Sequence, residues 1–212
     1  MSLLLDDKIV LEIDYLPRKV LKAEYPELLS APSVTQWLKD RDSDAFFRRQ
    51  MANPNSAMAK AVRAGTQAHR ALETGVTTDA MDEAIISCFN ETVYPDIDKV
   101  VGREETLVHP TGYNGKFDLM AHFRDEYTMI DYKRTNKRRT PSTLKKYFQQ
   151  LCAYRFAHNW LYPSHYITRC AIVNIYGTDV DNIQSKVTVL TATQMEDYES
   201  QFLLRVSSGE CV

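Results

Sequence analysis

Two short apolar runs joined by a polar turn constrain the folding of this chain more than any other stretch. The runs are residues 119–123 and 127–130, and residues 124–126 between them read Arg-Asp-Glu. Apolar runs of this length around a tight polar turn are typical of a β-hairpin. In such a hairpin Asp118, directly before the first strand, comes back beside Asp131, directly after the second, within about one residue of register.

The end of the second strand adds a lysine to these two carboxylates. Side chains alternate along a strand, so Asp131 and Lys133 share a face while Tyr132 points the other way. Two carboxylates and one ammonium group therefore converge on one spot. This arrangement suits a site that holds a divalent metal ion against a phosphodiester, although Asp-x-Lys alone is frequent by chance and usually marks a solvated strand end.

Helical and extended patterns alternate along the rest of the 212 residues, which predicts an α/β or α+β sandwich in a single domain over residues 1–212. Ser56 is placed to cap one helix and Gly75 to end it. The expected helices span residues 33–51, 57–74, 78–93, 142–160 and 193–206, and the expected strands outside the hairpin span residues 9–15, 105–109, 166–176 and 186–190.

Composition excludes several classes of protein. No run approaches roughly eighteen apolar residues, so we expect no membrane-spanning helix, and the opening apolar stretch is too short for a signal peptide. The four cysteines form no C-x-x-C pair, so neither a zinc ribbon nor an iron–sulfur cluster is expected, and reduced thiols are the default. These features favour a cytoplasmic protein.

The net charge of −2 hides one concentrated basic segment. Residues 133–146 include seven Lys or Arg residues and no acidic residue. This concentration suits a local contact with a polyanion and is less suited to coating nucleic acid all over. In isolation, the segment is more typical of a solvated loop and helix start.

Two of the expected helices carry further candidate residues. Gly65 lies inside the first of them, where glycine costs about 1 kcal/mol relative to alanine, so we expect a close approach there. His69 and Glu73 of the same helix are four residues apart and share a face. Gln150 and Tyr154 lie one turn apart in the other helix. Taken singly, a helical histidine is more often structural than a ligand, and a helical tyrosine usually belongs to the core.

Four short motifs thus follow one another along the chain, and together they are more specific than any one alone. They are Gly65-Thr66-x-x-His69-x-x-Leu72-Glu73, Gly115-x-x-Asp118, Asp131-x-Lys133 and Gln150-x-x-x-Tyr154. The series resembles the RecB-like branch of the PD-(D/E)XK nucleases over about residues 32–157. Two flanking stretches resemble, more narrowly, the mitochondrial genome maintenance exonucleases and their phage relatives. These stretches are Pro32-Ser33-Val34-Thr35 and Gly112-Tyr113-Asn114-Gly115.

The resemblance implies a restriction-endonuclease-like core with a central mixed β-sheet flanked by helices. In that family the positions matching His69, Asp118 and Asp131 ligate a divalent metal ion, assisted by the main-chain carbonyl at Tyr132. The position matching Lys133 positions or activates the attacking water. Carboxylate oxygens and water suit Mg²⁺ or Mn²⁺, and one imidazole among them tilts the preference toward Mn²⁺. The implied parts are a strand and helices over about 1–100, a catalytic core over about 56–190 and a C-terminal helix over about 193–206.

Other family positions concern the nucleic-acid strand. Gln150 and Tyr154 match a pair that braces the site and the strand, and Glu73 matches the acidic residue that closes the first motif. Many relatives place Thr or Ser directly after the motif lysine, where this chain has Arg134, so the contacts with the strand are expected to differ. Beside a site for phosphodiester cleavage, we favour backbone contact for the basic segment. The residues expected to contact nucleic acid are Lys116, Arg134, Lys137, Arg138, Arg139, Lys145 and Lys146.

The sequence therefore predicts a divalent-metal-dependent DNA exonuclease that acts on single-stranded ends. Its expected setting is replication, recombination or repair in a bacterial or phage-infected cell, with replication or recombination proteins as candidate partners. Two alternatives stay open at this point. One is a structure-specific endonuclease of the same fold, and the other is a non-catalytic protein that only binds nucleic acid.

Overall fold

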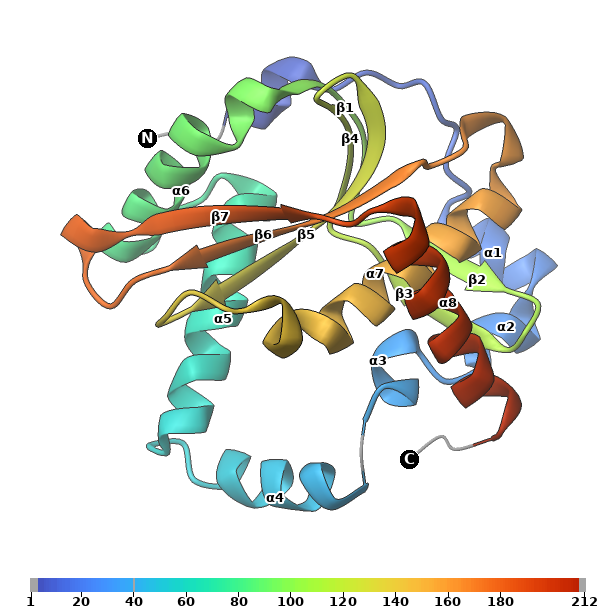
Figure 1. The fold of residues 1–212 in the computed structure, drawn as a ribbon, viewed down its shortest axis with the longest axis horizontal. Helices are drawn as coiled ribbons and strands as arrows, with labels where there is room; N and C mark the ends of the chain where they lie inside the picture. Colours follow the sequence, from blue (N-terminus) through green and yellow to red (C-terminus); the bar gives the residue numbers. More distant parts are fainter. Residues whose placement is uncertain (1–3, 40, 210–212) are drawn as a thin grey trace.

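A five-stranded mixed β-sheet forms the centre of the computed structural model, which describes residues 4–39 and 41–209 (Figure 1). The strands are β1 Ile97–Arg103, β2 Thr106–His109, β3 Tyr113–Lys116, β4 Leu119–Phe123, β5 Glu126–Thr135, β6 Arg169–Tyr176 and β7 Gln184–Val189. The order in the main sheet is β1-β4-β5-β6-β7, and β2 and β3 form a separate two-stranded sheet. In the main sheet β5 and β6 run parallel, and the other neighbours are antiparallel.

Helices cover both faces of the main sheet (Figure 1). The long helices are α5 Ala57–Thr74 and α6 Ala80–Thr92 on one face, and α7 Pro141–Leu161 and α8 Ala192–Ser207 on the other. The shorter ones are α1 Arg18–Glu24, α2 Pro26–Ser30, α3 Val34–Trp37, α4 Arg41–Met51, and the 3₁₀ helices η1 Leu4–Lys8, η2 Tyr94–Asp96, η3 Pro163–His165 and η4 Val180–Asn182. The predicted mixed sheet flanked by helices is confirmed. Within the part of the chain that the structure describes, no helix is long and apolar enough to cross a membrane.

Alternate residues of β5 enter two separate hydrophobic cores. Met129 lies in the core beneath α7 and α8, together with Phe148 and Phe202. Its neighbour Ile130 lies in the core beneath α5 and α6, together with Phe89. Both faces of this central strand are covered, which is why its sequence is apolar on both faces instead of alternating with polar residues.

The hairpin predicted between Asp118 and Asp131 is formed by β4 and β5. Its two-residue turn, residues 124–125, has φ angles of 51° and 64°, which is the left-handed backbone of a type I′ turn. Leu119 pairs with Ile130. One residue further along, this register sets Asp118 opposite Asp131, so the predicted juxtaposition at the hairpin end is confirmed.

The boundaries of α5 agree with the sequence prediction because its caps are local. The Ser56 hydroxyl accepts a hydrogen bond from the N–H of Ala59 at 3.0 Å. At the other end Gly75 has a φ of 69°, and its N–H donates to the carbonyl of Ala71 at 2.8 Å.

The predicted strand over residues 9–15 is wrong. In this described stretch Ile9 makes a single parallel bridge to Val100, and no strand follows. The Tyr15 ring instead packs on Gly102, where an added Cβ would lie 2.7 Å from the ring. The Tyr15 hydroxyl lies 3.2 Å from Nε2 of the buried His158. The alternating pattern therefore reflects the anchoring of single side chains, without sheet pairing.

The single helix predicted over residues 33–51 is also wrong, because the structure has two helices, α3 and α4, in this range. α3 begins at the predicted capping box, where the Ser33 hydroxyl accepts from the N–H of Gln36 at 3.3 Å. It ends where Trp37 and Leu38 are buried in the core, so tertiary packing overrides the local helical pattern. α4 stands apart from the sheet and joins α3 to α5 along the chain (Figure 1).

His109 makes the stability of this fold sensitive to acid. Its ring is buried against Tyr113 and Phe156, and burial lowers the pKa of His109 from 6.5 to about 4. The unfolded chain therefore takes up this proton at a higher pH than the folded protein, so stability present above pH 6.5 is lost as the pH falls toward 4. We expect His109→Phe to lose about 1–2 kcal/mol less free energy of unfolding than the wild type between pH 7.5 and pH 5.

Urea denaturation at the two pH values, in EDTA, measures this difference. Comparison with the variant cancels the titration of groups common to both proteins. An equal loss of stability in the two proteins would show that His109 takes up its proton in the folded state as easily as in the unfolded chain.

Candidate functional site

β5 extends past the beginning of β4, so its second half has a strand partner on only one side. β6 continues beside this half of β5, whereas β4 begins at Leu119, opposite Ile130. On the open side, a side chain instead of a strand forms a hydrogen bond with the β5 backbone. Oδ2 of Asp118 accepts a hydrogen bond from the main-chain N–H of Tyr132 at 2.9 Å. The hairpin thus ends in a carboxylate bound directly to the strand that carries Asp131.

Lys133 engages the carboxylate of Asp131, on the shared face that the sequence predicts. The lysine Nζ lies 2.6 Å from each of the two carboxylate oxygens. It also lies 4.9 Å from the centre of the Tyr147 ring of α7. The Asp131 side chain is only 3% exposed, so this ion pair is largely removed from water and its charges are weakly screened.

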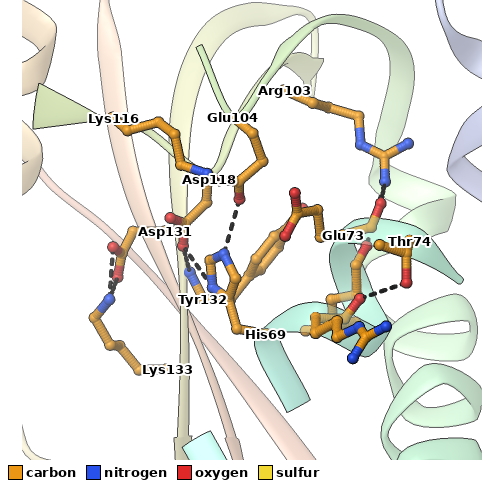
Figure 2. A network of polar contacts seen from close by, with 12 residues as sticks. His69, Glu73, Thr74, Arg103, Glu104, Lys116, Asp118, Asp131, Tyr132 and Lys133 are labelled. Atoms are coloured by element: carbon orange, nitrogen blue, oxygen red, sulfur yellow. Dashed lines mark hydrogen bonds and ion pairs between the residues drawn. The ribbon is translucent and has the colours of Figure 1, made fainter. Parts of the chain in front are cut away.

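His69 reaches the same place from α5 (Figure 2). Its Nδ1 lies 3.6 Å from Oδ2 of Asp118, and its ring packs edge-on against the Tyr132 ring, with 6.2 Å between centroids. Its other nitrogen, Nε2, lies 2.8 Å from Oε1 of Glu104. The structure therefore brings His69, Asp118, Asp131 and Lys133 together from one helix and one hairpin.

Burial sets the electrostatics of this group. It raises the pKa of Asp118 to about 7; the charge of Asp131 adds to the rise, and those of Lys133 and His69 oppose it. Burial also raises the pKa of Asp131, against the effect of Lys133. Burial alone would lower the pKa of Lys133, but the charges of Asp131 and Asp118 outweigh it and the pKa is raised. Additional positive charge near these buried carboxylates would favour their ionised form.

Gln150 and Tyr154 of α7 form the wall on the other face of the hairpin. Gln150 Nε2 donates to the Tyr154 hydroxyl at 2.8 Å. The Tyr154 ring lies directly against Gly115 of β3, where an added Cβ would come within 2.2 Å of the ring. The glycine of the second motif is thus explained by the close approach of the motif tyrosine.

Glu104 is the residue of this group that sequence reasoning missed. It lies between β1 and β2, outside the four motifs, and binds His69. Among the described residues, a set of three potential metal ligands with all ligand atoms within 4.8 Å of one another consists of His69, Glu73 and Glu104. The pair Glu104-Glu105 is unremarkable in the sequence, and no local spacing points to it. Its role depends on the long-range pairing of β1 with β4.

The close approach expected at Gly65 is not supplied by the protein. An added Cβ at Gly65 would meet no other atom within 4 Å. The glycine borders a small hollow that is also lined by Ala68, His69 and Lys133. The close approach expected at Gly65 thus has no counterpart among the described residues, and the space beside the glycine lies open next to the site.

Two of the residues predicted to contact nucleic acid interact with other residues of the chain in this structure. Lys116 forms an ion pair with Glu104. Arg134 donates to the carbonyl of Gly177 at 2.7 Å, which ties the end of β5 to the segment that follows β6. The charges of Lys116 and Arg134 therefore hold together segments of the chain that border the site.

The rest of the basic segment lies at the surface. A cavity of about 420 Å³ opens between α5 and the segment that connects β5 to α7. Ala61 and Ala64 of α5 form one of its sides. Its basic lining residues are Arg134, Lys137, Arg138 and Arg139, and Lys145 and Lys146 are exposed near the start of α7.

Comparisons with known proteins give distant similarities of fold. No family model and no curated protein matches the chain. A candidate exonuclease from Eubacterium rectale is similar with a TM-score of 0.42 at 11% identity, over 64% of this chain and 57% of that one. The alkaline exonuclease LHK-Exo from Laribacter hongkongensis is similar in two crystal structures. The complex with dAMP gives a TM-score of 0.39 at 13% identity, covering 88% of this chain and 91% of that chain. The other gives 0.38 at 15%, covering 87% and 92%.

The two motif glycines are expected to respond in opposite ways to alanine. Gly115→Ala drives a methyl group into the Tyr154 ring and should lower the free energy of unfolding by about 1–3 kcal/mol. Gly65→Ala places a methyl group in open space inside a helix and should raise it by up to about 1 kcal/mol. Urea denaturation monitored by circular dichroism measures both changes. Equal stability of the two variants would contradict the packing of Tyr154 on Gly115.

Proposed function

We propose that the protein is a divalent-metal-dependent nuclease that hydrolyses phosphodiester bonds of DNA, and that it acts as an exonuclease on single-stranded ends. One observation carries this proposal. Asp118, Asp131 and Lys133 meet at the open edge of β5, and His69 joins them from α5. Carboxylates, an imidazole and an ammonium group gathered in a buried place are the groups that phosphodiester hydrolysis with a metal ion requires.

The donor set fits a divalent cation. The carboxylates of Asp118 and Asp131 and the imidazole of His69 would hold it, and these ligand types suit Mg²⁺ or Mn²⁺. The main-chain carbonyl of Tyr132 is the fourth candidate ligand. The N–H and C=O groups of one strand residue point to the same neighbour, and the N–H of Tyr132 points to Asp118. Its carbonyl therefore faces the open side of β5.

Phosphodiester cleavage needs positive charge where its transition state gathers negative charge, and a bound cation would supply part of it. Side chains of the protein supply further positive charge and a rigid wall. The ammonium group of Lys133, held between Asp131 and the Tyr147 ring, contributes a second positive charge on the same face. The Gln150–Tyr154 pair of α7 braces the wall on the same side as Lys133, since its hydrogen bond and the contact with Gly115 fix the tyrosine hydroxyl.

The DNA strand is proposed to follow the basic surface to this site. Lys137, Arg138 and Arg139 line the cavity beside α5, and positive side chains there suit contact with phosphates. The open space at Gly65 lies on the same helix, nearer His69, and would admit the strand closely. Replication, recombination or repair in the cytoplasm of a bacterial or phage-infected cell is the proposed setting.

Preference for free ends is proposed to come from α4. This helix lies apart from the sheet between α3 and α5 (Figure 1). Phe46 and Phe47 on it are exposed, at 56% and 39%, and its last turn carries Arg48 and Arg49. Exposed aromatic rings can stack on bases and arginines can contact phosphates. In the proposal α4 would lie across the path of the strand, which would favour a threaded end over a continuous strand.

Purified protein is expected to degrade labelled linear single-stranded DNA with Mg²⁺ or Mn²⁺ and to be inactive in EDTA. Asp131→Ala should lower the rate by at least about 100-fold, because it removes a metal ligand and leaves Lys133 unpaired. Asp181→Ala, at an exposed position in η4, is the matched control and should keep the wild-type rate. Lack of degradation with either metal, in folded wild-type protein, would refute the nuclease proposal.

Circular single-stranded DNA is expected to survive under conditions that degrade the linear form. A strand without an end cannot thread past α4, whereas a linear strand with one end blocked is still attacked from the other. Gel analysis of circular DNA, linear DNA and linear DNA blocked at each end in turn measures this preference. Cleavage of the circle at the linear rate would replace the exonuclease proposal with an endonuclease of the same site.

A further inference from the structure

The side chain of Glu104 joins two parts of the chain that are far apart in sequence. Its Oε1 lies 2.8 Å from Nε2 of His69 on α5, and its other oxygen forms an ion pair with Lys116 on β3. Figure 2 shows the Glu104 carboxylate between these two partners. The Glu104 side chain is 12% exposed, so its carboxylate is largely removed from water, whereas Lys116 is 53% exposed.

The backbone of Glu104 is also fixed to the site. Its N–H donates to the carbonyl of Asp118 at 3.1 Å. Its φ of 55° lies in the left-handed region, which L residues adopt at an energetic cost and glycine adopts freely. Glycine would therefore adopt this backbone conformation with less strain than glutamate. Because the backbone alone does not favour glutamate, a specific role at this position must come from its side chain.

The contact with Glu104 determines which nitrogen of His69 is available. An ionised carboxylate only accepts hydrogen bonds, so the His69 nitrogen beside it must carry the proton. Nε2 is at hydrogen-bonding distance from Glu104. Nδ1, at 3.6 Å from Asp118, lies beyond that distance. In the neutral ring the lone pair is therefore on Nδ1, the nitrogen that faces the proposed metal ligands.

We propose that Glu104 is a positioning residue, which holds His69 as the Nε2–H tautomer and presents Nδ1 to the cation. The inference rests on the proposed function, because it assigns the orientation of one ligand of that site. Metal-binding histidines commonly donate their second N–H to a carboxylate, which fixes the ring and makes the ligand nitrogen more basic. The ion pair with Lys116 contributes to the same positioning, since it stabilises Glu104 in the ionised form that accepts hydrogen bonds.

The tautomer of His69 is a direct test without metal or DNA. Long-range ¹H–¹⁵N correlation spectra of ¹⁵N-labelled protein in EDTA at pH 9 report which imidazole nitrogen is protonated, and His69→Gln identifies the signal. We expect the Nε2–H tautomer in the wild type and in Glu104→Gln, whose amide oxygen still accepts. In Glu104→Ala the population of the Nδ1–H tautomer should rise, because Asp118, on the Nδ1 side, is then the carboxylate nearest to the ring. An Nδ1–H tautomer in the wild type, or an unchanged tautomer in Glu104→Ala, would overturn the inference.

Mn²⁺ binding to the full chain, measured by calorimetry without DNA, tests the consequence. Glu104→Ala should weaken Mn²⁺ binding by about 10–100-fold, and Glu104→Gln should restore most of the affinity. Glu105→Gln, at the adjacent position, should leave it unchanged. Unchanged Mn²⁺ affinity in Glu104→Ala would contradict the inference. If Glu104→Ala does not fold, Glu104→Gly replaces it, since glycine suits the left-handed backbone.

These readouts separate the inference from the function on which it rests. Mn²⁺ binding that depends on Glu104, in a protein that leaves every DNA substrate intact, would uphold the positioning role and refute the nuclease proposal. Nuclease activity and Mn²⁺ affinity that are both insensitive to Glu104→Ala would uphold the nuclease proposal and refute the positioning role.

Discussion

The site depends on one hydrogen bond, from the main-chain N–H of Tyr132 to the carboxylate of Asp118. β5 extends beyond the first residue of β4. At this end of the hairpin the Asp118 side chain takes the hydrogen bond that a longer β4 would have made through its backbone. A continued ladder would have used the backbone groups of β5 on that side. Because β4 begins one residue after Asp118, the edge of β5 stays open, and side chains from α5 and from the β1–β2 connection can reach it.

Local signals account for what the sequence predicted well. The caps at Ser56 and Gly75 and the polar turn of the hairpin depend on residues within a few positions of one another. Elements that depend on distant partners were missed. β1 mixes charged and apolar residues in Ile97–Arg103 and is defined by pairing with β4. Residues 9–15, far earlier in the chain, have the better strand pattern, yet they make one bridge to Val100 and no ladder.

The candidate site divides in the same way. Asp118, Asp131 and Lys133 could be placed from the sequence, since one hairpin register and the alternation of one strand suffice. His69 could be assigned to the site only through its family motif, because no local rule brings α5 to the end of β5. Glu104 was indicated neither by a local pattern nor by a family motif. Its position follows from a left-handed backbone after β1 and a contact across 35 residues of sequence.

The charges around the site are consistent with the cation of the proposed function. Lys133 is paired with Asp131 and Lys116 with Glu104, so each described lysine of the cluster already neutralises one carboxylate. Asp118 has His69 as its ion-pair partner, at the longer distance of 3.6 Å. It is also the carboxylate whose pKa burial raises to about 7. The fold therefore keeps a carboxylate in a buried place without a lysine of its own, and a divalent cation bound there would lower that pKa again.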